Sequence, residues 1–168
     1  MINIYCSTKL SSIIKSEKFI GGNSDPENEW SAHLFPIAGR KCAIFVNKET
    51  LYSVVLVDVL KKDLLNLQVI FTEFLIKQLE INKMLTPKYE SHIRETNQIM
   101  NIYTTDNDRK TMGSLTDFIY HIKASYYDSG DLDTVKTYVV KYLNTMPSKV
   151  LKFYTPNDAM NQKIKNFG

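Results

Sequence analysis

The polar residues best suited to chemistry are gathered in one short segment, 106–114, which runs into a stretch with helical apolar spacing. Ser114 stands at the expected start of that helix. A helix N-terminus offers free backbone N–H groups and the positive end of the helix dipole, which together bind phosphate or carboxylate groups. Arg109 and Lys110 add positive charge, and Asp108 adds a polar side chain beside them. The segment therefore predicts an anion-binding site.

A second source of positive charge is the first expected hairpin, which carries Arg40 and Lys41. If the fold brings this hairpin to segment 106–114, the two residues form a second wall of the anion site. Gly113 favours the same interpretation, because a residue without a Cβ lets a ligand approach the backbone closely. The alternative is a solvated loop in which Ser114 is an ordinary helix cap, and the spacing matches no established phosphate-binding motif.

The single tryptophan, Trp30, follows an acidic loop, and His33 lies three residues further on in an apolar, strand-like run. A tryptophan here either anchors the loop on the core or forms an exposed hot spot for a protein partner. A lone histidine on a strand is either a hydrogen-bonded structural residue or an acid or base in catalysis. Trp30 and His33 are therefore candidate partner-binding residues, and His33 is also a candidate for moving a proton.

Familiar catalytic and cofactor motifs are missing from the sequence. His33, His92 and His121 are scattered, with neither the i, i+4 spacing nor the cysteine pairs of a metal site. There is no Gly-x-Ser-x-Gly, Gly-x-Gly-x-x-Gly or P-loop pattern. We therefore expect no metal and no cofactor, and the sequence leaves open whether the protein is an enzyme.

Positive charge is concentrated at the C-terminal end of the chain, whose net charge is +3. From residue 136 onward there is one acid, Asp158, against six lysines: Lys136, Lys141, Lys149, Lys152, Lys163 and Lys165. Aromatic residues are interspersed among these lysines, as in proteins that bind single-stranded nucleic acid without sequence preference. Only three of the 21 basic residues are arginines, which is less favourable to nucleic-acid recognition. A solvated lysine face is the alternative.

The hydrophobic periodicities predict an α+β fold, in which an antiparallel β-meander sheet is covered on one face by four to five helices. Alternating and apolar runs predict strands over 1–6, 32–37, 42–46, 51–57 and 102–105. Capping residues predict helices that begin at Asp63, Thr86, Ser114, Asp131 and Thr155. Residues 21–29 and 106–113 are expected to form loops because they are rich in polar residues and glycine.

The composition is typical of one ordinary domain over residues 1–168, with 43% hydrophobic and 23% charged residues. Two cysteines, Cys6 and Cys42, are too few for a disulfide framework and are expected to be reduced thiols. The apolar stretches are much shorter than the roughly 20 residues of a membrane span, and the first residues lack the pattern of a secretion signal. We therefore expect a cytoplasmic protein without membrane contact.

The order of several short motifs along the chain is informative about its family. These motifs include Trp30-Ser-Ala, the Arg40-Lys-Cys hairpin, Asp108-Arg109-Lys110 followed by Gly113-Ser114, and Leu143-Asn144 with Pro147. In this order the chain resembles an uncharacterised bacterial family of domains of unknown function, over nearly its whole length. The resemblance implies no established activity, cofactor or catalytic residue. It singles out the polar residues of these motifs for testing.

Three functions remain open at this level. The leading interpretation is a non-catalytic binding or regulatory domain whose partner is an anionic small molecule or another protein. The first alternative is an enzyme acting on a phosphate-bearing small molecule or nucleotide, in which Arg109 and Lys110 hold the anion and Asp108 or His33 moves a proton. The second alternative is a sequence-tolerant nucleic-acid binder that uses the C-terminal lysines.

Overall fold

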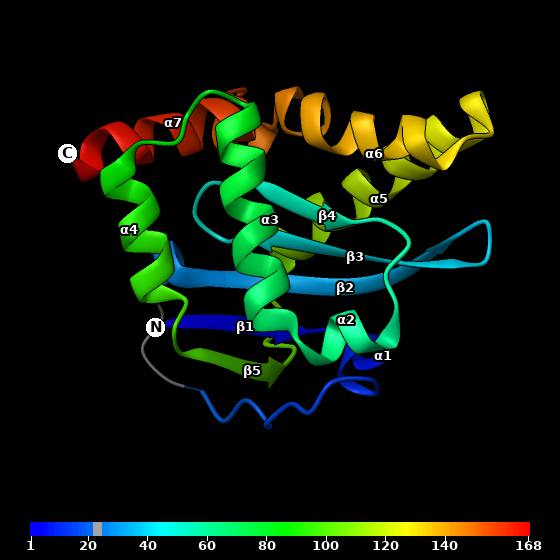
Figure 1. Ribbon diagram of the computed structural model, residues 1–168, viewed down its shortest axis with the longest axis horizontal. Helices are drawn as coiled ribbons and strands as arrows, with labels where there is room; N and C mark the ends of the chain where they lie inside the picture. The colour runs from blue at the N-terminus through cyan, green and yellow to red at the C-terminus, as the bar shows by residue number, and fades with distance from the viewer. Residues whose placement is uncertain (22–24) are drawn as a thin grey trace.

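A computed structural model describes residues 1–21 and 25–168 (Figure 1). Part of the expected loop over 21–29 therefore lies outside the described residues. The strands are β1 (Ile2–Cys6), β2 (Glu29–Ile37), β3 (Arg40–Asn47), β4 (Ser53–Leu56) and β5 (Met100–Thr104). The described α-helices are α1 (Thr8–Ser11), α2 (Lys61–Leu65), α3 (Leu67–Ile81), α4 (Pro87–Thr96), α5 (Arg109–Ser129), α6 (Leu132–Lys141) and α7 (Pro156–Phe167). Short 3-10 turns lie at η1 (Pro26–Asn28), η2 (Leu143–Thr145) and η3 (Lys149–Leu151).

The five described strands form one mixed sheet in the order β4-β3-β2-β1-β5. The expected meander is present, because β2 pairs antiparallel with β3 and β3 pairs antiparallel with β4. However, β1 pairs in parallel with both β2 and β5, so the prediction of a purely antiparallel sheet was wrong. The long connections before β2 and before β5 allow these parallel pairings, since parallel neighbours need a crossover rather than a tight turn.

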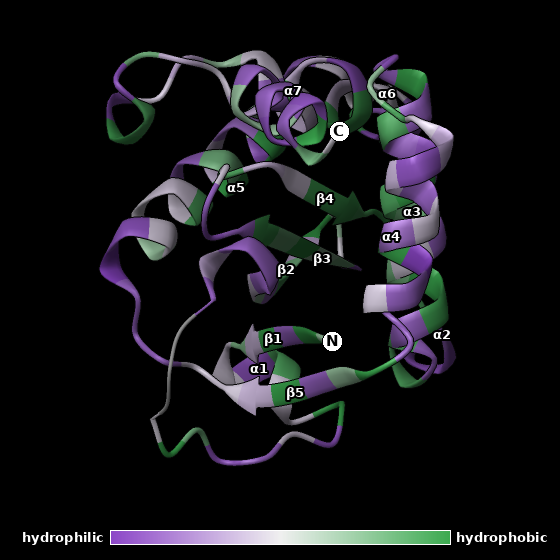
Figure 2. Cartoon of the chain, turned by 90° about the vertical axis from the view of Figure 1, so that its left-hand side faces the viewer, coloured by the Kyte–Doolittle hydropathy of each residue, from purple (hydrophilic) through white to green (hydrophobic). Residues whose placement is uncertain are grey.

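Helices cover both faces of the sheet, which corrects the prediction of one covered face. On one face α3, α4 and α7 pack on the sheet, with Phe71 of α3 between Trp30 and Phe45. On the other face α5 and α6 pack on side chains such as Ile44 and Val46. Figure 2 shows the apolar strands β3 and β4 between helices that carry many hydrophilic residues. The unbroken apolar run of β3 is typical of a strand that is buried on both sides.

Most helix starts follow the expected capping chemistry. Thr86 caps α4, Asp131 caps α6 and Thr155 caps α7, each through a side-chain oxygen that accepts a hydrogen bond from a backbone N–H of the first turn. The expected helix from Asp63 is divided at Asn66 into α2 and the core helix α3. The Asp63 carboxylate still stabilises the start of α2, because it accepts a hydrogen bond from the Leu60 N–H at 2.8 Å.

Both edges of the sheet have partners other than strands. At β4, the Asn144 amide accepts a hydrogen bond from the Ser53 N–H at 2.8 Å and donates one to the Ser53 carbonyl at 2.8 Å. The Gln78 amide donates a second bond to the same carbonyl at 2.7 Å. At β5, the backbone of Glu17 bonds to Ile102 and Thr104. Among the described residues, no helix is long and apolar enough to cross a membrane.

Candidate functional site

The start of α5 differs from the prediction and changes the chemistry of segment 106–114. Asp108 is the N-cap of α5, and its carboxylate accepts hydrogen bonds from the Lys110 N–H at 3.1 Å and from the Thr111 hydroxyl. The prediction of a helix start at Ser114 was therefore wrong. Ser114 lies inside α5, where its hydroxyl donates to the Lys110 carbonyl at 3.4 Å. Asp108 caps α5 because its carboxylate satisfies the Lys110 N–H, one of the free N–H groups of the first turn.

A groove of about 540 Å³ lies between the first half of α5 and the chain that follows η2. We call it the α5 groove. Its α5 wall includes Arg109, Lys110, Gly113 and Ser114, four of the residues that the sequence analysis singled out. The remaining lining residues are Asp117, Phe118, His121, Met146, Pro147, Ser148, Lys149 and Val150. The sequence thus pointed to one wall. On the opposite wall, more than 30 residues later in the chain, it had singled out only Lys149, as one of the C-terminal lysines and not as a partner of Arg109.

The α5 groove has an excess of positive charge. Arg109, Lys110 and Lys149 line it, and none of the three forms an ion pair with any residue in the described parts of the chain. Asp117 is the one carboxylate among the described residues that line it, and His121 lies one helical turn after Asp117. Unpaired cations keep their capacity to bind an external anion, so the groove suits a phosphate or a carboxylate.

The floor of the α5 groove combines apolar side chains with a glycine. Phe118 is 5% exposed and belongs to the core beneath α5, and Met146 packs against the same core. Gly113 lies within α5, and a Cβ built on it would meet nothing within 4 Å. The glycine therefore leaves open space at the wall of the groove. It does not mark a helix start as the sequence analysis expected.

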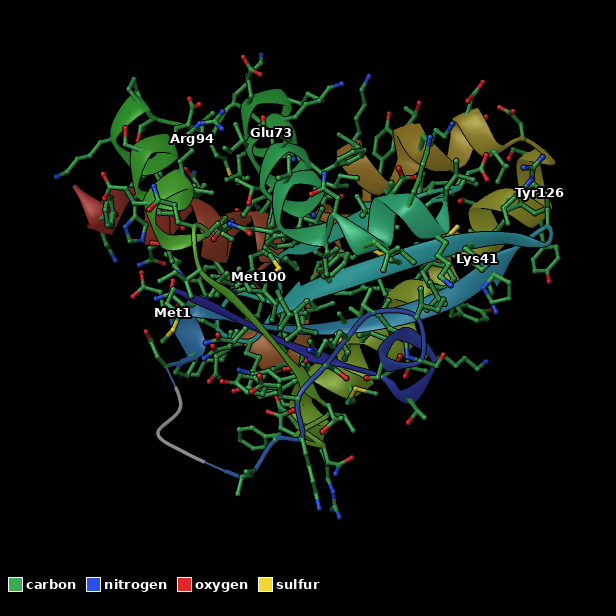
Figure 3. The ribbon with its side chains drawn as sticks, turned by 60° about the horizontal axis from the view of Figure 1, so that its bottom comes forward. Met1, Lys41, Glu73, Arg94, Met100 and Tyr126 are labelled. Atoms are coloured by element: carbon green, nitrogen blue, oxygen red, sulfur yellow. The ribbon has the colours of Figure 1, made fainter. Side chains whose placement is uncertain are left out.

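Arg40 and Lys41 lie at the opposite end of α5. Their hairpin turns at Ala38 and Gly39, which both have positive φ angles (48° and 74°), as the tight turn of a hairpin requires. The hairpin tip faces the last turns of α5, and Figure 3 shows Lys41 and Tyr126 at the same end of the molecule. Tyr126 lies 17 residues after Arg109, which is roughly 25 Å along a helix. The fold does not bring Arg40 and Lys41 to the groove, and Arg40 pairs with Asp58 at 3.6 Å.

Trp30 and His33 are also separated from the α5 groove. Trp30 is 4% exposed, with its ring centroid 5.0 Å from that of Phe71, so it anchors the core and is not an exposed aromatic. His33 is half-buried near Lys9 and Lys123, and its Nδ1 has no hydrogen-bond partner among the described residues. Burial, with a further contribution from the two lysines, lowers the pKa of His33.

A second cluster of charged residues was missed by the sequence analysis, and we call it the buried ion network. Lys48 is 8% exposed, and its ammonium bonds to Glu29 at 3.0 Å and to Asp106. The ammonium also lies 3.7 Å from the centre of the Tyr5 ring, and the Tyr5 hydroxyl donates to Glu29 at 2.9 Å. Burial and the neighbouring Glu29 raise the pKa of Tyr5. Lys48 follows a strand and resembles an ordinary turn lysine, so no local signal reveals its burial.

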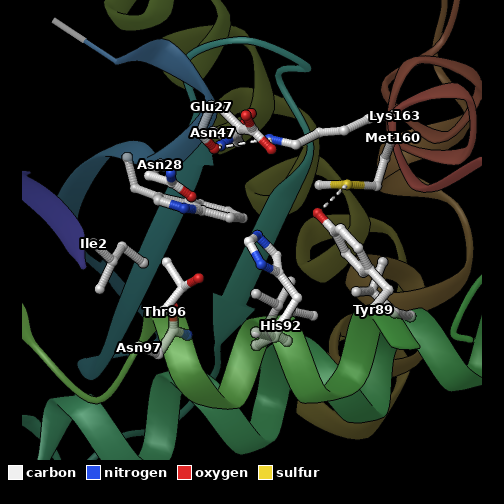
Figure 4. A pocket seen from close by; sticks show the side chains of 14 residues that line it. Ile2, Glu27, Asn28, Asn47, Tyr89, His92, Thr96, Asn97, Met160 and Lys163 are labelled. Atoms are coloured by element: carbon white, nitrogen blue, oxygen red, sulfur yellow. Dashed lines mark hydrogen bonds and ion pairs between the residues drawn. The ribbon is translucent and has the colours of Figure 1, made fainter. Parts of the chain in front are cut away.

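A small cavity on the other face of the sheet is lined by Trp30, His92 and Lys163 among others (Figure 4). Its volume of about 30 Å³ has room for about two water molecules, so it is too small for an organic ligand. Lys163 bonds to Glu49 at 2.8 Å and donates to the Glu27 carbonyl at 2.8 Å. One of the six C-terminal lysines is therefore largely buried and paired, so it does not add to an exposed basic surface.

Comparison with known proteins places the chain in one family. A family model described as a domain of unknown function (DUF6933) matches residues 3–159. The chain belongs to this family. All residues that line the α5 groove and all four members of the buried ion network lie within the matched range. No curated protein and no solved structure matches the chain. Within the described residues, no group of three or more His, Cys, Asp or Glu side chains is placed to hold a metal ion.

Proposed function

We propose that this DUF6933 domain binds an anionic small molecule in the α5 groove. The observation that carries the proposal is the meeting of three unpaired cations, Arg109, Lys110 and Lys149, from two distant parts of the chain. Charged residues that are merely solvated usually follow one another on a single helix or loop. Here the cations come from a helix and from a separate turn, which form opposite walls of the groove. The volume of about 540 Å³ is within the range of roughly 300–1,000 Å³ that small-molecule sites occupy.

The arrangement favours binding over catalysis by the residues that the sequence suggested. Asp108 is engaged in capping α5. His33 lies near Lys123, which is 14 residues after Arg109 and so about 20 Å from it along the helix. A proton-moving role for Asp108 or His33 on an anion held by Arg109 is therefore unsupported. We propose a binding or regulatory module, and the two free cysteines, Cys6 and Cys42, are consistent with a place in the reducing cytoplasm.

The test is a calorimetric and thermal-shift screen with inorganic phosphate, small carboxylates and phosphorylated metabolites. A ligand at 100 times its Kd stabilises the fold by about 2.7 kcal/mol, which raises Tm by several degrees. We expect Arg109→Ala and Lys149→Ala each to weaken binding at least tenfold. Lys77→Ala, which removes an exposed lysine on α3, is the matched control and should bind as the wild type does. Equal binding by all three variants would overturn the proposal.

A second function has one specific observation in its favour, because Asp117 and His121 both line the groove one helical turn apart. A carboxylate and an imidazole at this spacing can act together on a proton of a bound phosphate ester. An enzyme of this kind would hydrolyse a phosphomonoester, with water as the attacking group and an alcohol and inorganic phosphate as the products. His121→Asn would then abolish phosphate release while binding remained. If the protein binds a phosphomonoester but releases no phosphate from it, the enzymatic function is wrong and only the binding function stands.

A further inference from the structure

We propose that the ligand of the α5 groove is a nucleotide unit, whose phosphate lies among the groove cations and whose base stacks on Phe153 and Tyr154. This inference rests on the proposed function and adds the class of ligand. It depends on the loop of residues 148–154, whose first three residues line the groove and whose last residues, Phe153 and Tyr154, are not part of the lining. The loop belongs to the connection between α6 and α7, which projects on the same side as the start of α5 (Figure 2).

The loop is tied directly to the wall of the groove. The Phe153 N–H donates to the Ser148 carbonyl at 2.8 Å, and the Ser148 N–H donates to the Tyr154 carbonyl at 3.1 Å. Ser148 lines the groove, as does Lys149 after it. The backbone of both aromatic residues is therefore hydrogen-bonded to Ser148, a residue of the groove wall.

Both rings are left in solvent. Phe153 is 70% exposed and Tyr154 is 64% exposed, although the nearby Phe118 shows that the same region can bury an aromatic side chain. Lys152 and Phe153 also have positive φ angles of 54° and 69°, a conformation that is costly for residues other than glycine. Backbone hydrogen bonds from both N–H groups hold this conformation. The fold thus maintains an exposed pair of rings beside a cationic groove at some cost.

The combination of cations and exposed rings selects among anionic ligands. Inorganic phosphate and sugar phosphates use only the cations, whereas a nucleotide also offers a planar base. Stacking of a base on an aromatic side chain is sequence-tolerant, because every base has a flat π face. A free nucleotide and a single nucleotide within a strand share this chemistry, and they differ in whether additional phosphates contribute to binding.

The experiment compares inorganic phosphate, ribose 5-phosphate, a nucleoside monophosphate and a single-stranded hexanucleotide, each titrated by calorimetry into the full chain. We expect the nucleoside monophosphate to bind about tenfold or more tightly than ribose 5-phosphate. In the double variant Phe153→Ser/Tyr154→Ser, the affinity for ribose 5-phosphate should be unchanged. The affinity of this variant for the nucleoside monophosphate should fall to about the same value. Tyr127→Ser, which removes a ring that is 81% exposed near the far end of α5, is the matched control. Upfield shifts of the base protons in NMR provide an independent sign of stacking.

The outcomes separate this inference from the proposed function. Equal affinity for the nucleoside monophosphate and ribose 5-phosphate would overturn the nucleotide inference while the anion site stands. A nucleotide advantage that survives in the double variant would overturn the role of Phe153 and Tyr154. No binding of any of the four probes would overturn both proposals. A hexanucleotide that binds more tightly than the monophosphate, with strong salt dependence, would support the inference and identify a strand as the source of the nucleotide unit.

Discussion

The buried ion network and the α5 groove adjoin the same short connection between β5 and α5, yet they use charge in opposite ways. In the network, one lysine is shared by two carboxylates and covered by an aromatic ring. In the groove, three cations face solvent without an ion-pair partner among the described residues. Asp106 belongs to the network, and Asp108, two residues later, caps the helix that begins the groove. Buried charges here join parts of the fold, while the exposed cations of the groove are, in our proposal, available for a ligand.

The largest expected effect is a loss of stability that occurs when the buried ion network is changed and not when the α5 groove is changed. Lys48→Met leaves the buried Glu29 and the partly buried Asp106 without their shared cation, which should lower the free energy of unfolding by about 3–5 kcal/mol. Lys149→Met, in the groove, should change it by no more than about 0.5 kcal/mol. Chemical denaturation of both variants provides the measurement. Losses of similar size would show that the contrast between the clusters is wrong.

The next effect tests a buried polar contact without charge. Asn144→Ala removes the hydrogen bonds to the backbone of Ser53 and should cost about 1–3 kcal/mol, since the Ser53 N–H is left unpaired in the core. Thr145→Ala, at the exposed neighbouring position, is the control and should be nearly neutral. If denaturant midpoints of the two variants coincide, Asn144 does not stabilise the edge of the sheet.

A smaller effect of opposite sign is expected in the groove. Gly113→Ala should raise the free energy of unfolding by about 0.5–1 kcal/mol, because alanine favours a helix interior over glycine and the new Cβ has open space. The same methyl group reduces the space for a ligand, so affinity for phosphate compounds should fall. A variant that is more stable and binds equally well would place the ligand away from Gly113.

The smallest effect is a change in pH dependence at His33, whose pKa is lowered by burial and by Lys9 and Lys123. The unfolded chain binds this proton at a higher pH, near the ordinary value of about 6.5, than the folded chain does. Stability should therefore be full above that pH and decline as pH falls toward the lowered folded pKa. His33→Asn should show a flatter decline in urea denaturation over this window. Parallel curves for both proteins would contradict the assignment.

The local chemistry of the chain was predictable, and its long-range pairings were not. Thr86, Asp131 and Thr155 each cap a helix where expected, because a cap depends on residues within one turn. The start of α5 was placed too late because Asp108 and Ser114 are both plausible caps, and a sequence pattern does not rank them. The parallel pairing of β1 with β2 and β5 joins residues about 25 and 100 positions apart, beyond the reach of periodicity.

For the candidate site, too, the residues close together in sequence were predictable, and the residues brought together by the fold were not. Arg109 and Lys110 were identified from their position before a helix, but Lys149 comes from a turn that only the tertiary fold places opposite them. Arg40 and Lys41 were grouped with them by charge alone, and the length of α5 separates the two pairs. Burial of Lys48 depends on Asp106, 58 residues away, so its role could not be inferred from its neighbours in sequence.

The side-chain amide of Asn144 has a consequence for how copies of this protein behave toward one another. A bare edge strand offers its backbone groups to the strand of any other molecule and so promotes aggregation. Here an amide, which has the same donor and acceptor as a peptide group, occupies that position at Ser53, and the backbone of Glu17 occupies the opposite border at β5. The chain's own groups thus occupy part of each border, which leaves fewer free backbone groups for pairing with a strand of another molecule.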